Sequence, residues 1–229
     1  MCIRDSNQGE VVGIAGVEGN GQRELAESIL GVYPIESGEI ILGESLINEL
    51  STRDRRESGL SFIPEDRQSQ GLLMDVSLSE NVILGKQSST KYKSRYSNIK
   101  FNEASKNSNT VIENFDVRTP GNSTLALALS GGNQQKFVVG REIENKPSLL
   151  IASQPTRGID IGAQSLIWNK LRDARDEGLG VLLISADLDE LIGLSDRIYV
   201  IYEGSFVKEL DPENATPEIL GSYMTGLKT

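Results

Sequence analysis

The 229-residue sequence predicts an α/β fold: a central, mostly parallel sheet flanked by helices, with an inserted α-helical subdomain. Apolar runs of strand length alternate with helical segments, which is the pattern of a sheet covered on both faces. The first strand is followed by a glycine-rich loop and a helix, which is the layout of a P-loop. Between residues 68 and 146 this alternation gives way to helical and polar segments, which indicates the insertion.

Composition excludes several classes of function. The formal net charge is −10 at pH 7, and an acidic chain is poorly suited to bind nucleic acid through phosphate contacts. No apolar run approaches the roughly 18 residues of a membrane span. Histidine is absent and Cys2 is the only cysteine. Ser-His-Asp and Cys-His catalysis, a disulfide framework and the usual zinc sites are therefore excluded, and no metal site is predicted.

The first six residues, MCIRDS, continue no pattern found in the rest of the chain. They have neither the apolar core of a signal peptide nor an amphipathic face. We expect a non-native or unstructured leader at 1–6 and a single domain at 7–229. The chain is then expected to be a fragment of a protein that begins further upstream.

The predicted core occupies residues 9–67 and 147–229 and carries all the predicted strands. The first, EVVGIA at 10–15, is a buried strand. Gly31 and Gly178 are placed to end helices, and Glu203-Gly204 is a short connection between two paired strands. The predicted strands are 10–15, 39–42, 60–63, 149–152, 181–184, 197–202 and 205–210, and the predicted core helices are 22–30, 51–57, 163–176, 188–194 and 217–224.

The predicted helical subdomain occupies residues 68–146. We expect a short helix at 77–84 and a longer one at 101–115, where the helical period is broken. Residues 86–100 between them are polar and rich in Ser, Lys and Tyr, so they are predicted to be an exposed connection. The last helix follows Ser130 and is expected to bury one apolar face, formed by Phe137, Val138, Val139 and Ile143.

The string LSGGNQQK at 129–136 is the stretch around which the other motifs are arranged. Ser130 is a good helix N-cap, and it is followed by Gly131 and Gly132. Two glycines at a helix start allow a ligand to come close to the backbone. The free N–H groups and the positive end of the helix dipole favour a phosphate. For SGG alone, a glycine-rich turn before an ordinary helix is the alternative.

The glycine-rich loop at 16–23, GVEGNGQR, keeps the glycine spacing of a P-loop but not its functional side chains. In G-x-x-x-x-G-K-[ST] the amides cradle phosphates, the lysine reaches the β- and γ-phosphates and the hydroxyl holds magnesium. Here Gln22 replaces the lysine and Arg23 the hydroxyl residue. We expect a loop that binds nucleotide weakly or without turnover, with a simple turn as the alternative. Its candidate nucleotide-binding residues are Gly16, Gly19, Asn20, Gly21, Gln22 and Arg23.

The order and spacing of five strings extend these observations to nearly the whole chain. LSGGNQQK resembles the signature motif of ATP-binding cassette (ABC) proteins, whose fold is a P-loop NTPase core with a helical subdomain. GNGQREL at 19–25, PEDR at 64–67, QPTRGID at 154–160 and SDRIYVIYEG at 195–204 fit the same family. The resemblance is closest to the second ABC domain of the tandem ATP-binding subunits that energise sugar and nucleoside importers.

The resemblance also implies that no catalytic residue is intact. Where the family has Asp-Glu at the end of a strand, for magnesium and for the attacking water, this chain has Ser153 and Gln154. Ala186 stands where the family has a histidine that contacts the γ-phosphate. Glu65 stands where it has a glutamine linking nucleotide to permease. The isolated chain is therefore predicted not to hydrolyse ATP.

In this family two ABC domains pack head to tail, so that each ATP lies between the P-loop of one and the signature of the other. The resemblance implies that this chain completes an ATP and Mg²⁺ site whose P-loop belongs to another ABC domain, expected in the same polypeptide. It also implies transmembrane permease subunits as partners, docked near residues 71–84, and indirectly a substrate-binding protein, at the cytoplasmic face of the membrane. The residues implied at the shared site are Ser130, Gly131, Gly132, Asn133 and Gln134, with Asp160 in the loop that crosses to the partner.

Two other functions stay open at this point. One is a free-standing pseudo-ATPase that acts as a binding or regulatory module. The other is an ABC ATPase of DNA maintenance, although the long coiled-coil insertion usual before the signature in that class is not found here. For an importer, the strings FDVRTPG and QPTRGID slightly favour nucleosides over sugars as cargo.

Overall fold

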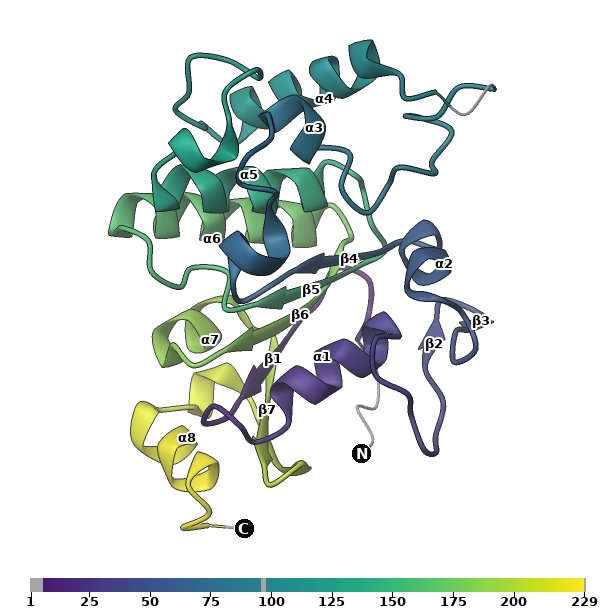
Figure 1. Cartoon of the computed structure of the whole chain (residues 1–229). Coiled ribbons are helices and arrows are strands. Elements are labelled where there is room, and N and C mark those ends of the chain that lie inside the picture. The colour runs from purple at the N-terminus through teal and green to yellow at the C-terminus, as the bar shows by residue number, and fades with distance from the viewer. Residues whose placement is uncertain (1–5, 96–97, 229) are drawn as a thin grey trace. The chain divides into compact units, whose positions relative to one another are not determined.

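The computed structural model describes residues 6–95 and 98–228 and shows two compact units (Figure 1). The first unit contains the chain up to residue 62, residues 147–154 and the chain from residue 171 onward. The second contains residues 63–146 and 155–170. The second unit is thus larger than the helical subdomain predicted at 68–146, because 63–67 and 155–170 pack with it. The leader predicted at 1–6 lies outside the described residues except for Ser6.

A six-stranded sheet forms the centre of the fold, and it confirms the predicted fold class. The strand order is β4-β5-β6-β1-β7-β8. Strand β1 is parallel to both β6 and β7, β5 is parallel to β6, and only β8 is shown antiparallel, to β7. The strands are β1 (Val11–Ala15), β4 (Leu60–Ile63), β5 (Leu149–Ser153), β6 (Gly180–Ser185), β7 (Arg197–Tyr202) and β8 (Ser205–Leu210).

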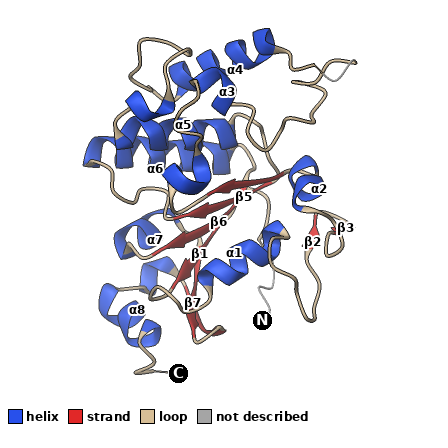
Figure 2. Ribbon diagram, in the orientation of Figure 1, coloured by secondary structure: helices blue, strands red, loops and turns tan. Residues whose placement is uncertain are grey.

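Helices of the first unit cover both faces of β1 (Figure 2). Val12 and Ile14 belong to a buried cluster with Ala26 of helix α1 (Gln22–Leu30). On the opposite face a Cβ placed on Gly13 would lie 3.0 Å from Leu191 Cδ2 of helix α7 (Leu188–Leu194). Because successive residues of a strand point to opposite faces, β1 can be apolar throughout. The first unit also contains α8 (Pro217–Met224) and the 3₁₀ turn η3 (Pro212–Asn214).

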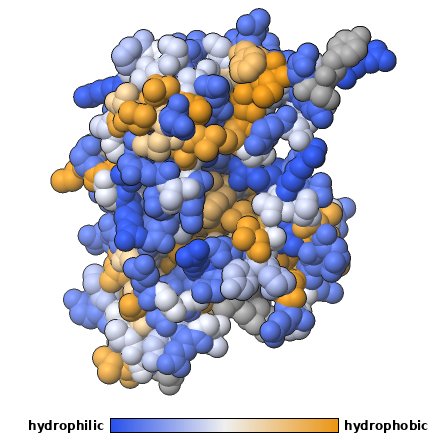
Figure 3. Space-filling view, viewed as in Figure 1, coloured by the Kyte–Doolittle hydropathy of each residue, from blue (hydrophilic) through white to orange (hydrophobic). Residues whose placement is uncertain are grey.

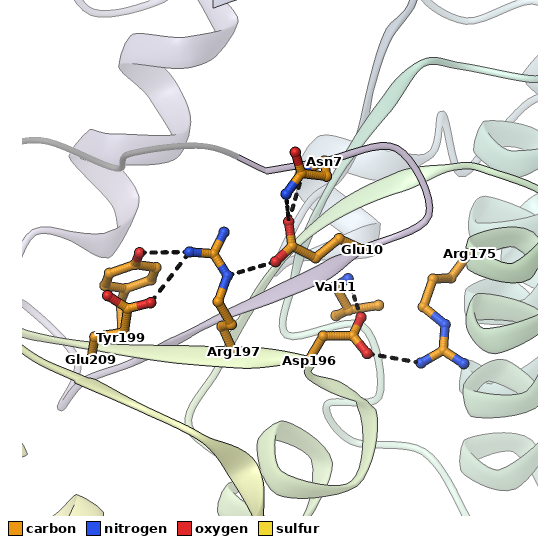
Figure 4. A network of polar contacts seen from close by, with 8 residues as sticks. All are labelled: Asn7, Glu10, Val11, Arg175, Asp196, Arg197, Tyr199 and Glu209. Carbon is orange, nitrogen blue, oxygen red and sulfur yellow. Dashed lines mark hydrogen bonds and ion pairs between the residues drawn. The ribbon is translucent and has the colours of Figure 1, made fainter.

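A polar network fixes the start of β1 against β7 (Figure 4). Arg197 donates from Nε to Glu10 Oε1 at 2.6 Å and from Nη1 to Tyr199 Oη at 3.0 Å. Asp196 accepts a hydrogen bond from the backbone N–H of Val11 at 2.7 Å. Burial pushes the pKa of the Glu10 carboxyl up, but hydrogen bonds from Arg197 and Asn7 outweigh it and hold that pKa below its usual value. The strand that leads into the glycine-rich loop is therefore anchored at its beginning.

Short elements surround the C-terminal end of α1. Strands β2 (Ile41–Leu42) and β3 (Ser45–Leu46) form a two-stranded antiparallel sheet, and α2 (Thr52–Glu57) follows it. The buried Arg55 of α2 donates from Nη1 to the carbonyls of Ser28 and Ile29, both at 2.8 Å. These carbonyls belong to the last turn of α1, so the guanidinium caps that helix.

The second unit is helical, as predicted. Its π-helical turn η1 (Arg67–Gly71), which the sequence did not predict, follows an Asp66 side chain that accepts from the backbone N–H of Gln68 and Ser69. The predicted short helix is α3, and Ser77 and Glu80 form a capping box at its start. The elements of this unit are α3 (Leu78–Asn81), α4 (Phe101–Asn114), the 3₁₀ turn η2 (Ala126–Ala128), α5 (Gly131–Ile143) and the first part of α6 (Ile161–Asp176).

Two expectations for this unit are corrected. In the connection at 86–100, predicted to be exposed, Tyr92 is fully buried and accepts a hydrogen bond from Asn107 Nδ2. Helix α5, predicted to bury one apolar face, is buried at every residue from Gln134 to Glu142. Its polar side chains reach acceptors inside the unit, which hydropathy alone does not reveal. Among the described residues, no helix is long and apolar enough to cross a membrane.

Candidate functional site

The signature sequence lies at the N-terminus of α5. Ser130 is the N-cap, with φ −63° and ψ 157°, and its Oγ accepts from Asn133 Nδ2 at 3.0 Å. Asn133 Oδ1 accepts from the backbone N–H of Arg118 at 2.9 Å. Gly131 and Gly132 are the first helical residues, so their N–H groups have no acceptor within the helix. The arrangement leaves two backbone donors and one hydroxyl at the positive end of a 13-residue helix.

The interior of α5 holds this terminus in place. Gln134 Nε2 donates to the carbonyls of Ala126 and Leu129, at 3.1 and 3.3 Å. Gln135 Nε2 donates to the carbonyl of Pro155 at 2.7 Å. Gln134 is only 2% exposed. Unlike Ser130, Gly131, Gly132 and Asn133, it therefore supports the helix from inside.

Asp160 of the QPTRGID string lies beside the signature. A Cβ placed on Gly132 would lie 3.1 Å from Asp160 Oδ2. Asp160 Oδ1 accepts from the backbone N–H of Ala163 at 3.0 Å, in the first turn of α6. That hydrogen bond is the main cause that holds the pKa of the Asp160 carboxyl below its usual value, so the group is anionic at neutral pH. The structure thus brings together the signature and the loop predicted to cross to a partner.

Glu65 of the PEDR string is paired with Arg157 of the QPTRGID string. Arg157 Nη1 forms a hydrogen-bonded ion pair with Glu65 Oε1. Arg67 Nη1 donates to the Arg157 carbonyl at 3.0 Å. A Cβ on Gly131 would lie only 2.7 Å from Arg67 Nη2, so this guanidinium lies against the first residue of α5. Both strings are recognisable in the sequence, but the sequence does not single out Arg67 or Arg157, because nothing in it places them beside the signature.

The glycine-rich loop at 16–21 belongs to the first unit and joins β1 to α1. Gly19 and Gly21 have φ values of 92° and 106°, which favour glycine. Asn20 fastens the loop to the β7–β8 turn: its Oδ1 accepts from the N–H of Glu203 and its carbonyl from the N–H of Gly204, both at 3.0 Å. The loop is therefore held by the chain itself.

The two side chains that replace the P-loop lysine and hydroxyl are both engaged. Gln22 Nε2 donates to the loop carbonyl of Val17 at 3.0 Å. A Cβ on Gly16 would lie 2.3 Å from that nitrogen, so the amide lies against the loop backbone. Arg23 points along α1, where its Nε pairs with Glu27 Oε1 at 2.7 Å, and its side chain is 72% exposed. The loop gains no free cation from either residue.

The positions predicted to be degenerate catalytic positions lie at the carboxyl ends of neighbouring parallel strands. Ser153 ends β5, and Ala186 follows the last residue of β6, which pairs with β1 at the start of the glycine-rich loop. Gln154 has φ 50°, its N–H donates to the Ile184 carbonyl at 2.7 Å, and its Oε1 accepts from the Ala186 N–H at 3.2 Å. None of these three side chains can carry a charge at neutral pH.

The groups of the first unit therefore suit phosphate binding but not phosphoryl transfer. Glycine amides remain, but no carboxylate stands at the positions that hold magnesium and polarise water. Within residues 6–95 and 98–228, no group of three His, Cys, Asp or Glu side chains could hold a metal ion. The signature of the second unit, in contrast, presents the Ser130 hydroxyl and the N–H groups of Gly131 and Gly132 at a helix N-terminus.

Comparison with protein families and curated proteins agrees with these motifs. The family model described as "ABC transporter" matches residues 4–157. The chain is 46% identical over 221 residues to the guanosine import ATP-binding protein NupO of Bacillus subtilis (strain 168), covering 95% of this chain and 42% of that protein. It is 43% identical over 225 residues to the nucleoside import ATP-binding protein NupA of Lactococcus lactis subsp. cremoris (strain MG1363), covering 97% and 44%. The chain thus spans less than half the length of these relatives.

Solved structures show the same fold. The dimeric structure of MJ0796, described as a bacterial ABC transporter cassette, superposes with a TM-score of 0.76 at 22% identity, covering 91% of this chain and 88% of that chain. The MJ1267 ATP-binding cassette gives a TM-score of 0.78 at 21% identity, covering 96% and 88%. These identities support the fold alone. The family model, by contrast, spans more than half of the sequence, and the chain belongs to the ABC transporter family.

Proposed function

We propose that this chain is the second ABC domain of the ATP-binding subunit of an importer for nucleosides or sugars. It supplies the signature to an ATP site whose P-loop belongs to another ABC domain, expected in the same polypeptide. The observation that carries the proposal is the contrast between the signature and the glycine-rich loop of this chain. Ser130, Gly131 and Gly132 present open donors at a helix N-terminus, whereas Gln22 and Arg23 are engaged within the chain.

The signature contributes charge stabilisation to a reaction that another domain carries out. Phosphoryl transfer spreads negative charge over the equatorial oxygens, and positioned donors supply most of the catalysis. The Ser130 hydroxyl and the Gly131 and Gly132 N–H groups provide such donors. Asp160 lies in the loop beside them, where it accepts from the Ala163 N–H, and under this proposal it would contact the partner domain. ATP and Mg²⁺ would be held mainly by that domain, with these groups closing the site.

The glycine-rich loop of this chain would form a second, impaired site. Its amides suit a phosphate, but Gln22, whose amide donates to the Val17 carbonyl, supplies no cation in place of the lysine. With Gln154 in place of the carboxylate, water next to a bound nucleotide has no general base. We infer that this site holds nucleotide weakly and without turnover, and that the isolated chain is not an ATPase.

A hydrophobic patch on the second unit is the expected contact with the permease. Figure 3 shows hydrophobic side chains gathered near α3 and α5. The segments that precede these two helices carry three exposed leucines, Leu73 (50%), Leu125 (42%) and Leu127 (55%), which we call the hydrophobic patch. The backbone N–H of Leu127 donates to the Met74 carbonyl at 2.9 Å, so the two segments run side by side. Leu72, also expected at this contact, is 5% exposed and packs inside the unit. Binding there would place the chain peripherally at the cytoplasmic face of the membrane, with a substrate-binding protein as an indirect partner.

Nucleosides are the favoured cargo. The names of two relatives, at 46% and 43% identity, specify guanosine and nucleoside import, while a glucose import relative from Haloferax volcanii has 45% and a ribose import relative from Clostridium tetani 37%.

Uptake by a strain that lacks the gene for the full-length protein tests this function. Labelled nucleosides and sugars should be measured with no plasmid, with the full-length gene, and with the gene carrying Ser130→Ala and Gly132→Asp. We expect nucleoside uptake to be lost in the deletion strain, restored by the unaltered gene and not by the variant. Unchanged uptake of every nucleoside and sugar in the deletion strain would refute an importer role.

A further inference from the structure

We propose that Arg67 is a nucleotide-binding residue of the signature half-site, where its guanidinium binds the γ-phosphate of ATP held on the partner ABC domain. The inference rests on the proposed function, since it needs a nucleotide facing the signature. It adds a cation to a half-site whose recognised donors, the Ser130 hydroxyl and the glycine amides, are all neutral.

The first observation is where the guanidinium lies. Arg67 Nη2 comes so close to Gly131 that a Cβ on this glycine would be 2.7 Å from it. Gly131 is the first residue of α5, so the cation lies beside the free N–H groups of the helix terminus. The guanidinium and the helix dipole then favour an anion at the same place.

The second observation is that the guanidinium is held in position. Its Nη1 donates to the Arg157 carbonyl at 3.0 Å. Arg67 is also the first residue of η1, which Asp66 caps by accepting from the N–H of Gln68 at 2.9 Å. A planar guanidinium anchored at one nitrogen keeps its other donors pointing in fixed directions, which suits bidentate phosphate binding.

The third observation is the charge balance around α5. Arg157 is paired with Glu65, and Lys136 with Asp116 at 2.9 Å. Arg67, in contrast, forms no ion pair with any described residue, and its buried Nε has no hydrogen-bond acceptor within the described chain. Of these three cations, Arg67 is the one without an ion pair in the described chain. The adjacent Asp66 carboxylate feels its charge but accepts its hydrogen bonds from the backbone N–H groups of Gln68 and Ser69.

The γ-phosphate is the group this cation fits. It carries the most negative charge of the nucleotide, and charge-assisted bonds from Arg are about twice as strong as neutral ones. On the α5 side, the Asp160 carboxylate lies at Gly132 and is already engaged by the Ala163 N–H. ADP lacks the γ-phosphate, so Arg67 should distinguish ATP from ADP.

Equilibrium binding of ATP and ADP to the full-length protein assembled with its permease tests this inference. The variants are Arg67→Gln, Arg67→Lys and, as a control, Arg53→Gln, whose side chain is 61% exposed and paired with Glu57 on α2. We expect Arg67→Gln to weaken ATP binding about ten- to a hundredfold, the usual effect of losing a hydrogen bond to a charged group. ADP binding should change less than about twofold by the same reasoning, Arg67→Lys should fall between, and Arg53→Gln should match the unaltered protein.

Equal weakening of ATP and ADP, or no weakening of either, would overturn the role of Arg67. Thermal unfolding measured alongside shows whether Arg67→Gln acts by destabilising the unit. If it does, the test depends on Arg67→Lys, which keeps the charge. This variant must bind ATP more weakly than the unaltered protein and must bind ADP equally well, or the inference is wrong.

A Ser130→Ala variant, measured in the same way, separates this inference from the proposed function. If Ser130→Ala weakens ATP binding and Arg67→Gln does not, Arg67 alone is misassigned; if neither does, the shared site itself is refuted.

Discussion

Gln154 Oε1 accepts a hydrogen bond from the backbone N–H of Ala186 at 3.2 Å, so the two positions that we propose have lost a catalytic carboxylate and a histidine are hydrogen-bonded to each other. Both follow parallel strands that are neighbours in the sheet. The glutamine fills its position with a neutral amide that is already engaged.

The isolated chain should release no phosphate from ATP. Losing one positioned catalytic group typically costs about 3 kcal/mol in the barrier, and here lysine, carboxylate and histidine are all replaced. Gln22→Lys alone should not restore turnover, because Gln154 and Ala186 remain. A steady-state phosphate-release assay on the purified chain checks this. Turnover of about 1 s⁻¹ or faster, within the usual range of enzymes, would contradict it.

Ser130→Ala combined with Gly132→Asp should abolish ATP hydrolysis by the full-length protein. The first change removes a hydrogen bond to a charged group, worth roughly 1.5–3 kcal/mol. The second places a carboxylate beside the phosphate and next to Asp160, whose Oδ2 would be 3.1 Å from the new Cβ. ATPase assays of the assembled transporter measure the loss.

Gly121→Asp is the matched control for this pair, since a Cβ on Gly121 meets nothing within 4 Å. It should leave hydrolysis unchanged. In the isolated chain the double change should not alter any weak nucleotide binding, because the signature serves a nucleotide on another domain. Hydrolysis by the doubly changed transporter at the unaltered rate would rule out the shared site.

Leu73→Glu and Leu127→Glu should each reduce co-purification with the permease. Both side chains are about half exposed on adjoining segments of the hydrophobic patch, so a charge there is tolerated in the free chain but is costly in a buried interface. Pull-down from detergent extract, with circular dichroism to confirm folding, measures the effect. Leu227→Glu, at an 82% exposed leucine of the first unit, is the control. Full recovery of the complex with both patch variants would argue against this contact.

Acid should weaken the fold through Glu10. The pKa of this carboxyl in the folded chain lies below its usual 4.5, so the folded state binds fewer protons than the unfolded state in acid. The stabilisation is therefore complete above about pH 4.5 and is lost as the pH falls through the folded-state pKa. Glu10→Gln should lower the free energy of unfolding at pH 7 by about 1–3 kcal/mol, and by less in acid.

Urea unfolding at neutral and acidic pH measures this difference. Glu57→Gln is the control, because that carboxylate is 45% exposed in its pair with Arg53 and should contribute little. If Glu10→Gln costs the same at both pH values, the ionised carboxylate is not the source of the stabilisation.

Strong local signals account for the parts of the fold that the sequence predicted. Helices 22–30, 188–194 and 217–224 and strands 60–63, 197–202 and 205–210 have the predicted bounds. Gly31 has φ 75° and ends α1 as a left-handed cap, and Thr216 caps α8 before Pro217. Glycine, proline and capping residues act within one turn of chain, so a sequence pattern suffices to locate them.

Contacts between distant segments account for what the sequence did not predict. The burial of Gln134 depends on carbonyls of η2, and Arg67 reaches Gly131 only because η1 lies beside α5. Strand β3 has two residues, too few for an alternating pattern. The family resemblance assigned the signature and the positions predicted to be degenerate, but it did not indicate which cation lies beside the signature.

The fastening of Asn20 to the Glu203–Gly204 turn has an evolutionary consequence. A phosphate-binding loop that depends on its ligand for order becomes a liability to folding once the ligand no longer binds. Here two hydrogen bonds of 3.0 Å to the hairpin keep the loop in shape instead. Neither hydrogen bond involves the side chain of Gln22 or Arg23, so residues at these two positions can vary without loosening the loop from the hairpin. Under the proposed function, a cassette whose loop is fastened in this way can serve another domain's reaction without binding a nucleotide of its own.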